Sequence, residues 1–164
     1  MAHCILNQNV RVAGGAHYPA VIDEVVDALR THRVGLVQMP CPEFTFAALN
    51  RPAGTREDYD TPRFRRHCAK IAGSIADQVD QYAKNGFQVL AVLGIERSPS
   101  CGVEQTTTRP DGPNGEAEAT SGQGIFIEEL QREFDSRHLQ VPFKGLDWRR
   151  VSKDVEELEG LLPP

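Results

Sequence analysis

The chain has 164 residues, of which 40% are hydrophobic and 25% charged, and its formal net charge is −5. This composition is typical of one globular domain and excludes a disordered or fibrous chain. Because acidic side chains outnumber basic ones, 23 to 18, we expect no nucleic-acid partner. No apolar run reaches the roughly 20 residues of a membrane span, and the N-terminus lacks the features of a signal peptide. We therefore expect a cytoplasmic protein with no membrane partner.

The first forty residues predict two strands with a helix between them. Residues 2–6 read as a short buried strand that ends in a polar turn. From about Pro19 the apolar residues recur at helical spacing. Residues 34–39 form a second apolar run, which Pro40 and Pro42 end.

A long helix and a third strand follow. Thr61 is a candidate N-cap with Pro62 in the first turn, and Asn85-Gly86 is a typical helix end. The continuous apolar run over residues 87–94 predicts a strand that is buried on both faces.

The last third of the chain begins with a polar segment. Residues 103–121 contain almost no apolar side chain, so we expect a long surface loop that is either a lid or flexible. A helix over 123–136, a strand over 139–143 and a helix in the tail from Asp147 complete the prediction.

Strands that alternate with helices predict an α/β fold with parallel strands. We expect a single domain over residues 1–164, Rossmann-like and three-layered, with a small, mainly parallel sheet of about four strands. Ligands bind such sheets at the carboxyl ends of the strands, and we expect the functional site there.

Three cysteines fall at that edge in the prediction. Cys4 lies late in the first strand, Cys41 lies just beyond the second, and Cys101 lies in the loop after the third. In the cytoplasm a disulfide framework is not expected, and convergent thiolates suit a soft metal such as an iron–sulfur cluster or zinc. The alternative is that each thiol only fills the core. We assign that structural role to Cys68, which falls on the apolar face of the long helix.

The residues beside these cysteines add chemistry. Prolines flank Cys41, and Glu43 places a carboxylate near its thiol. Ser98 and Ser100 precede Cys101, and Gly102 allows close backbone approach. The alternatives are that Glu43 stabilises a helix N-terminus and that the serines satisfy loop backbone.

The segments Cys4-Ile5-Leu6, Cys41-Pro42-Glu43 and Ser98-Pro99-Ser100-Cys101-Gly102 resemble, in this order, those of the 2-thiouracil desulfurase family. The resemblance extends from about residue 2 to the helix near Gly122. It implies a 4Fe–4S cluster with three cysteine ligands, which would be Cys4, Cys41 and Cys101. It also implies Glu43 as the acid–base residue and Ser98 as a helper hydroxyl.

By this resemblance the chain would be a desulfidase that hydrolyses a thiocarbonyl compound, thio-nucleobase-like, with the sulfur bound to the open iron. The family's opening motif reads like CLLGxxCRYDGG, whereas this chain has Asn7, Val10, Val12 and Ala13 in place of its glycine, second cysteine, tyrosine and aspartate. The substrate therefore need not be thiouracil. The alternatives are a non-catalytic iron–sulfur module that carries or senses sulfide, and a zinc- or thiol-binding domain.

The remaining polar candidates are weaker. His3 adjoins Cys4 but would point to the opposite strand face. His17 lies near the predicted site and is a candidate substrate contact, while Arg11 and Arg97 either pair within loops or bind an anionic group. The sequence leaves open whether the chain forms a homodimer.

Overall fold

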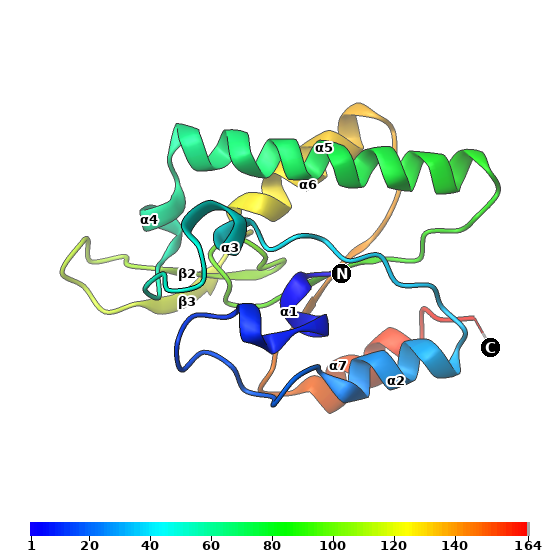
Figure 1. Ribbon diagram of the computed structural model, residues 1–164, viewed down its shortest axis with the longest axis horizontal. Helices are drawn as coiled ribbons and strands as arrows, with labels where there is room; N and C mark the ends of the chain where they lie inside the picture. The colour runs from blue at the N-terminus through cyan, green and yellow to red at the C-terminus, as the bar shows by residue number, and fades with distance from the viewer. Residues whose placement is uncertain (164) are drawn as a thin grey trace.

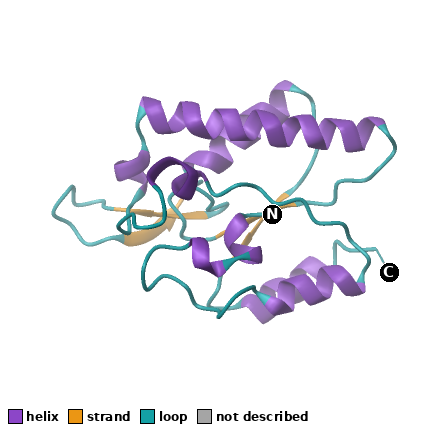
Figure 2. Cartoon of the chain, viewed as in Figure 1, coloured by secondary structure: helices purple, strands orange, loops and turns teal. Residues whose placement is uncertain are grey.

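The computed structural model describes residues 1–163, so Pro164, the last residue of the predicted domain, lies outside the described part. The fold is mixed α/β, with helices on both sides of a small sheet (Figures 1 and 2). In chain order the elements are α1 (His3–Leu6), η1 (Gln8–Val10), α2 (Asp23–Thr31), α3 (Pro42–Ala47), α4 (Arg56–Tyr59), α5 (Pro62–Lys84), β1 (Val92–Ile95), β2 (Gln105–Thr108), β3 (Glu118–Ser121), α6 (Ile125–Ser136), β4 (Phe143–Leu146) and α7 (Val151–Glu159).

The central sheet has one continuous parallel ladder, in which β1 pairs with β4. The N-terminal segment lies on the other side of β1, where the Ala2 amide donates to the Leu93 carbonyl at 2.8 Å. Ala2 also forms an isolated parallel bridge with Met39. The central strands and the neighbouring segments therefore follow the order β4, β1, N-terminal segment and residues 37–39. Only two of them form a ladder. The last strand lies later than predicted, because β4 shares only Phe143 with the expected strand 139–143.

Two of the predicted strands are wrong in type. The chain becomes helical at His3, one residue after the bridge, so residues 3–6 form α1 instead of a strand. Residues 34–38 have no regular secondary structure. Short apolar runs suit a buried helical turn and a strand equally well, and here Ile5 is fully buried in helical geometry. The third strand is also shorter than predicted, because Phe87 at its expected start is 65% exposed.

The segment 103–121 is not the structureless loop that its composition predicted. β2 and β3 form an antiparallel hairpin in register from Gln105 opposite Ser121 to Thr108 opposite Glu118. Threonine favours strands because its branched side chain packs well on a pleated surface, and Thr106 is 2% exposed. The prediction gave too little weight to these threonines.

The long helices agree with the predicted pattern. The side chain of Thr61 caps α5 by accepting from the Phe64 amide at 3.2 Å, and Gly86 beyond its end has φ of 81°. α5 packs against α6 on one side of the sheet, and α2 packs against α7 on the other (Figure 1). No helix in residues 1–163 combines the length and the apolar character that a membrane span requires.

Candidate functional site

The loop after β1 holds the Ser-Pro-Ser-Cys sequence in a tight turn. The Ile95 amide donates to the Cys101 carbonyl at 3.0 Å. Inside the turn, Oγ of Ser98 accepts from the amides of Cys101 at 3.0 Å and of Ser100 at 3.3 Å. Ser98 therefore satisfies loop backbone, which was one of its two predicted roles.

Three glycines allow the neighbouring backbone to reach this loop. A Cβ atom on Gly94 would lie 2.4 Å from the Cys101 carbonyl oxygen, and one on Gly124 would lie 2.4 Å from the Ser100 carbonyl carbon. A Cβ on Gly102 would lie 2.0 Å from the Gln105 carbonyl oxygen. The close approach expected at Gly102 is confirmed. Gly94 and Gly124 could not be recognised from the sequence, because their partners are distant along the chain.

The same loop caps α6. The amides of Phe126 and Ile127 both donate to the Ser100 carbonyl, at 3.0 and 3.1 Å, and the Ile125 amide donates to the Pro99 carbonyl at 3.0 Å. The first amides of a helix have no partner within the helix, and here the loop supplies their acceptors. The position of Cys101 is therefore tied to the start of a buried helix.

Cys41 is the N-cap residue of α3, with Pro42 in the first helical turn. Its carbonyl accepts from the Thr45 amide at 3.1 Å and from the Thr45 hydroxyl at 2.9 Å. Burial raises the pKa of the Cys41 thiol, and the Glu43 carboxylate raises it further, whereas backbone amides at the helix start and Arg51 lower it.

Cys4 lies in α1, directly after the bridge to residue 39. Its carbonyl accepts from the Gln8 side chain at 2.5 Å, and the Gln8 side-chain oxygen accepts from the His17 amide at 3.1 Å. Gln8 is 2% exposed and ties the following loop to α1. Burial raises the pKa of the Cys4 thiol to about 12, an effect that Arg11 opposes.

These three thiols lie within electrostatic reach of one another. Burial raises the pKa of Cys101 well above the ordinary range, and the charges of Cys41 and Cys4 raise it further. Cys41 acts in the same direction on Cys4. Three separate segments of the chain therefore bring their thiols to one region. Cys68 is fully buried on α5, and burial raises the pKa of its thiol. Among the charges that raise this pKa further, Glu129 has the largest effect, ahead of Glu43 and Cys41.

Within residues 1–163, no three histidine, cysteine, aspartate or glutamate side chains are placed so that they could hold one metal ion. In a four-iron cluster each thiolate binds a different iron atom, so its ligands lie farther apart than those of a single ion.

A buried carboxylate stands beside the thiols. Glu43 is 8% exposed, and its Oε1 accepts from the Ser100 hydroxyl at 2.6 Å. Its Oε2 lies 3.3 Å from Nε of Arg51, which is 7% exposed. The Ser100 hydroxyl also lies 3.6 Å from Sγ of Cys101 and 3.2 Å from the Ser98 hydroxyl. A hydrogen-bonded path thus joins Ser98, Ser100 and Glu43 next to Cys101.

Arg51 was missed in the sequence, where it opens a loop-like Arg-Pro-Ala-Gly run. Besides Glu43, its guanidinium donates to the Val10 carbonyl at 3.0 Å and to the Ala48 carbonyl at 3.2 Å. Nothing local marks this role, because the Val10 carbonyl lies 41 residues away along the chain.

The other polar candidates are engaged elsewhere. His17 stacks on Trp148 with ring centroids 3.4 Å apart. Arg97 pairs with Asp147 at 3.3 Å, as a loop-pairing residue would. His3 lies 2.5 Å from the Gln38 side chain.

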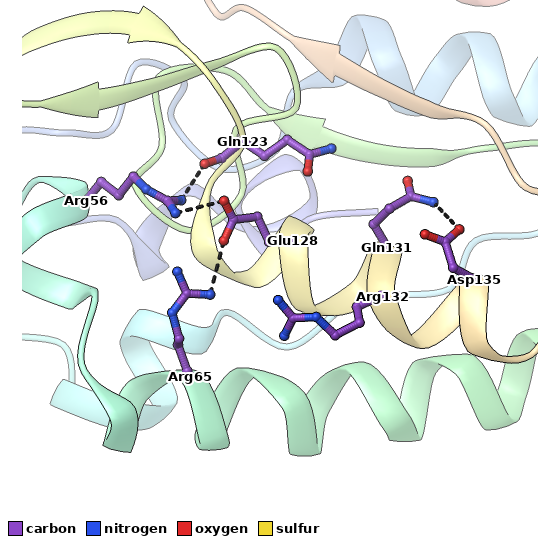
Figure 3. Close-up of a pocket in the computed structure, with 7 residues that line it drawn as sticks. All are labelled: Arg56, Arg65, Gln123, Glu128, Gln131, Arg132 and Asp135. Atoms are coloured by element: carbon purple, nitrogen blue, oxygen red, sulfur yellow. Dashed lines mark hydrogen bonds and ion pairs between the residues drawn. The ribbon is translucent and has the colours of Figure 1, made fainter.

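An open depression of about 710 Å³ lies beside α6, and no cysteine lines it (Figure 3). Its lining is polar and charged: Arg56, Arg65, Gln123, Glu128, Gln131, Arg132 and Asp135. Glu128 accepts from Arg56 at 2.7 Å and from Arg65 at 3.1 Å. These ion pairs join α4, α5 and α6, and we assign them a structural role.

Comparison with known proteins finds a similar archaeal chain. Over 157 residues the chain is 29% identical to the uncharacterized protein MJ0003 of Methanocaldococcus jannaschii, and the match covers 96% of this chain and 88% of that protein. No protein-family model matches the chain. No solved structure matches it either. The similarity to MJ0003 therefore extends over almost the whole chain.

Proposed function

We propose that the chain is an iron–sulfur-dependent desulfidase that removes sulfur from a small thiocarbonyl compound by hydrolysis. The observation that carries the proposal is the buried Glu43 carboxylate, which accepts from Ser100 next to Cys101 and raises the pKa of the Cys4, Cys41 and Cys101 thiols. The motif resemblance supplies the reaction class. The finer expectation for the fold, a Rossmann-like sheet of four parallel strands, belongs to the same proposal.

The donor set suits a 4Fe–4S cluster. Thiolates are soft ligands, and burial is the main cause that raises the pKa values of all three thiols. The neighbouring Glu43 carboxylate raises all three further, and the other thiols add to the effect at Cys4 and Cys101. A bound metal would compensate these charges and displace the thiol protons. When bound through three cysteines, the cluster would supply an iron with an open position for the substrate's sulfur.

The chain's own residues account for the protons. In the overall reaction water and a thiocarbonyl give a carbonyl and hydrogen sulfide, so both protons of water pass to the departing sulfur. In this proposal Glu43 takes one proton from water and returns it. The hydroxyl of Ser100 donates its one hydrogen bond to Glu43. The hydroxyl oxygen of Ser98 accepts hydrogen bonds from two backbone amides, so its O–H remains available to orient Ser100, water or substrate.

The remaining expectations follow from this chemistry. We propose a small thio-compound as the only ligand besides the cluster, and action in the cytoplasm, where thiols stay reduced. Homodimer formation is a separate question, for which size measurement in solution is the direct test.

Anaerobic reconstitution with iron and sulfide tests the cluster. We expect about four irons per chain and broad visible absorption. Serine at Cys4, Cys41 or Cys101 should reduce the iron content, while Cys68→Ser serves as the matched control and should retain it. A chain that binds no iron after reconstitution would contradict the proposal.

Sulfide release from a panel of thio-nucleobases and thioamides tests the reaction. Glu43→Gln should keep the iron and lose most of the sulfide release, by a factor of about 10² or more. A chain that binds iron but releases no sulfide from any member of the panel would favour the non-catalytic module that carries or senses sulfide.

A further inference from the structure

Two segments enter the sheet from the same side without pairing. Residues 34–38 and 88–91 contain no helix, turn or bend, and both run toward the N-terminus (Figure 1). Within residues 1–163, the amides of Gly35, Val37 and Ala91 donate no hydrogen bond. Unpaired strand-like backbone is costly unless water or another strand satisfies it.

A cavity of about 610 Å³ touches both segments and is lined mainly by apolar residues. Val37 and Leu93 lie on its two walls, and Val79 of α5 and Leu29 of α2 come from the two helical layers. The cavity thus has the surroundings of a central strand position, with backbone on two sides and apolar helices above and below.

We call this cavity between residues 34–38 and 88–91 the slot. Met1 lies at its inner end, and its backbone makes the hydrogen bonds of a strand residue. Its nitrogen donates to the Val37 carbonyl at 2.7 Å, and its carbonyl accepts from the Met39 amide at 2.8 Å. The next residue turns to the other wall, where the Ala2 amide donates to Leu93. This alternation is the pattern of a strand between two parallel neighbours.

The nitrogen of Met1 is a terminal amino group in a place that suits a peptide amide. Burial lowers its pKa from 8.0 to about 6, which reflects the cost of holding a charge there. A peptide nitrogen at the same position would make the same bond to Val37 without that cost.

We propose that the slot seats an extended apolar segment joined to the nitrogen of Met1, which would complete a four-stranded parallel sheet. The register of Met1 and Ala2 fixes its pairing. The second residue before Met1 would pair with Gly35 and Val37, and the first would pair with Ala91 and Leu93. About four residues would fill the slot, and β-branched apolar side chains would suit both faces.

The segment must be continuous with Met1. Met1 already fills the inner end of the slot, so a strand from a separate molecule would have to end against the buried terminal amino group of Met1. A strand that continues from this nitrogen meets no such obstacle.

Two extended versions of the full chain test the proposal. One carries Met-Lys-Val-Ile-Val ahead of Met1, and the control carries Met-Gly-Ser-Gly-Ser. The apolar extension should raise Tm by on the order of 5 °C relative to the control. It should also slow hydrogen exchange at the Val37 and Ala91 amides by about tenfold or more. Equal Tm values and equal exchange in the two versions would overturn the proposal.

Val37→Pro identifies the pairing itself. In the unextended chain the Val37 amide donates to nothing, so the substitution should change Tm little. In the chain with the apolar extension, Val37→Pro should remove most of the gain in Tm. The proline cannot donate the ladder hydrogen bond to the extension, and its ring disturbs the packing of the adjacent strand residues. A gain that survives Val37→Pro unchanged would overturn the proposed register. The free peptide Lys-Val-Ile-Val, added to the unextended chain, tests the requirement for continuity. If it slows hydrogen exchange at the Val37 and Ala91 amides as much as the fused segment does, that requirement is overturned.

Discussion

Replacing Arg51 with methionine should destabilise the protein by about 3–5 kcal/mol. The side chain of Arg51 is 4% exposed and that of Glu43 is 11% exposed, so the pair is shielded from solvent screening. Methionine keeps much of the apolar volume but leaves a buried carboxylate without its charged partner, for which losses of this size are typical. It also leaves the carbonyls of Val10 and Ala48 without the donors that Arg51 provides.

Urea denaturation of the reduced, metal-free chain, followed by circular dichroism, measures this cost. Arg30→Met is the matched control, because Arg30 and Asp27 are 74% and 67% exposed, and it should change stability by no more than about 0.5 kcal/mol. The double variant Glu43→Gln/Arg51→Met should lose less than the sum of its single variants. A cost below about 1 kcal/mol for Arg51→Met would refute the reading of this pair as a structural support of the site.

Three further predictions concern the frame around the site. Gly124→Ala should destabilise the chain by about 1–3 kcal/mol in urea denaturation because its Cβ would meet loop backbone at 2.4 Å, whereas Gly73→Ala, whose Cβ meets nothing within 4 Å in α5, should stabilise it by about 0.5–1 kcal/mol. Thr61→Ala should cost about 1 kcal/mol by removing the cap bond to the Phe64 amide, measured in the same way. For the metal-free chain, the free energy of unfolding should fall as pH rises from about 9 toward 12. The reason is that the unfolded chain loses the Cys4 proton near its ordinary pKa, while the folded chain holds this proton up to a pKa of about 12. Urea midpoints across this pH range, compared with those of Cys4→Ala, measure the effect.

The sequence predicted the neighbours of the sheet better than its strands. The apolar run at 2–6 and the one at 34–39 are neighbours, yet their parallel strand pairing is limited to the bridge between Ala2 and Met39. Periodicity cannot separate a short buried strand from a helical turn, and the turn at His3 depends on packing that is not local. The predicted loop at 103–121 failed for the opposite reason, since a local strand preference at Thr106 was present and was not used.

For the candidate site, the positions of the cysteines relative to predicted strand ends select Cys4, Cys41 and Cys101 as candidates, and their role as ligands stays a prediction. The helical setting of Cys4 was not predicted, but its position near the sheet edge is the same. The partners of Glu43 could not be predicted. Its contact with Ser100 spans 57 residues, and no sequence pattern distinguishes Ser100 from Ser98 as the serine that reaches the carboxylate.

The capping of α6 by the cysteine loop has a consequence for motion. Because the Ser100 carbonyl accepts from two amides of the first helical turn, the loop cannot rearrange while α6 keeps its start. α6 is in turn fully buried at Ile125, Phe126 and Ile127, so lifting that turn exposes apolar core. Opening of the loop and fraying of the helix are therefore one cooperative event, and exchange of the Ile127 amide reports how often the thiol of Cys101 is released from its place.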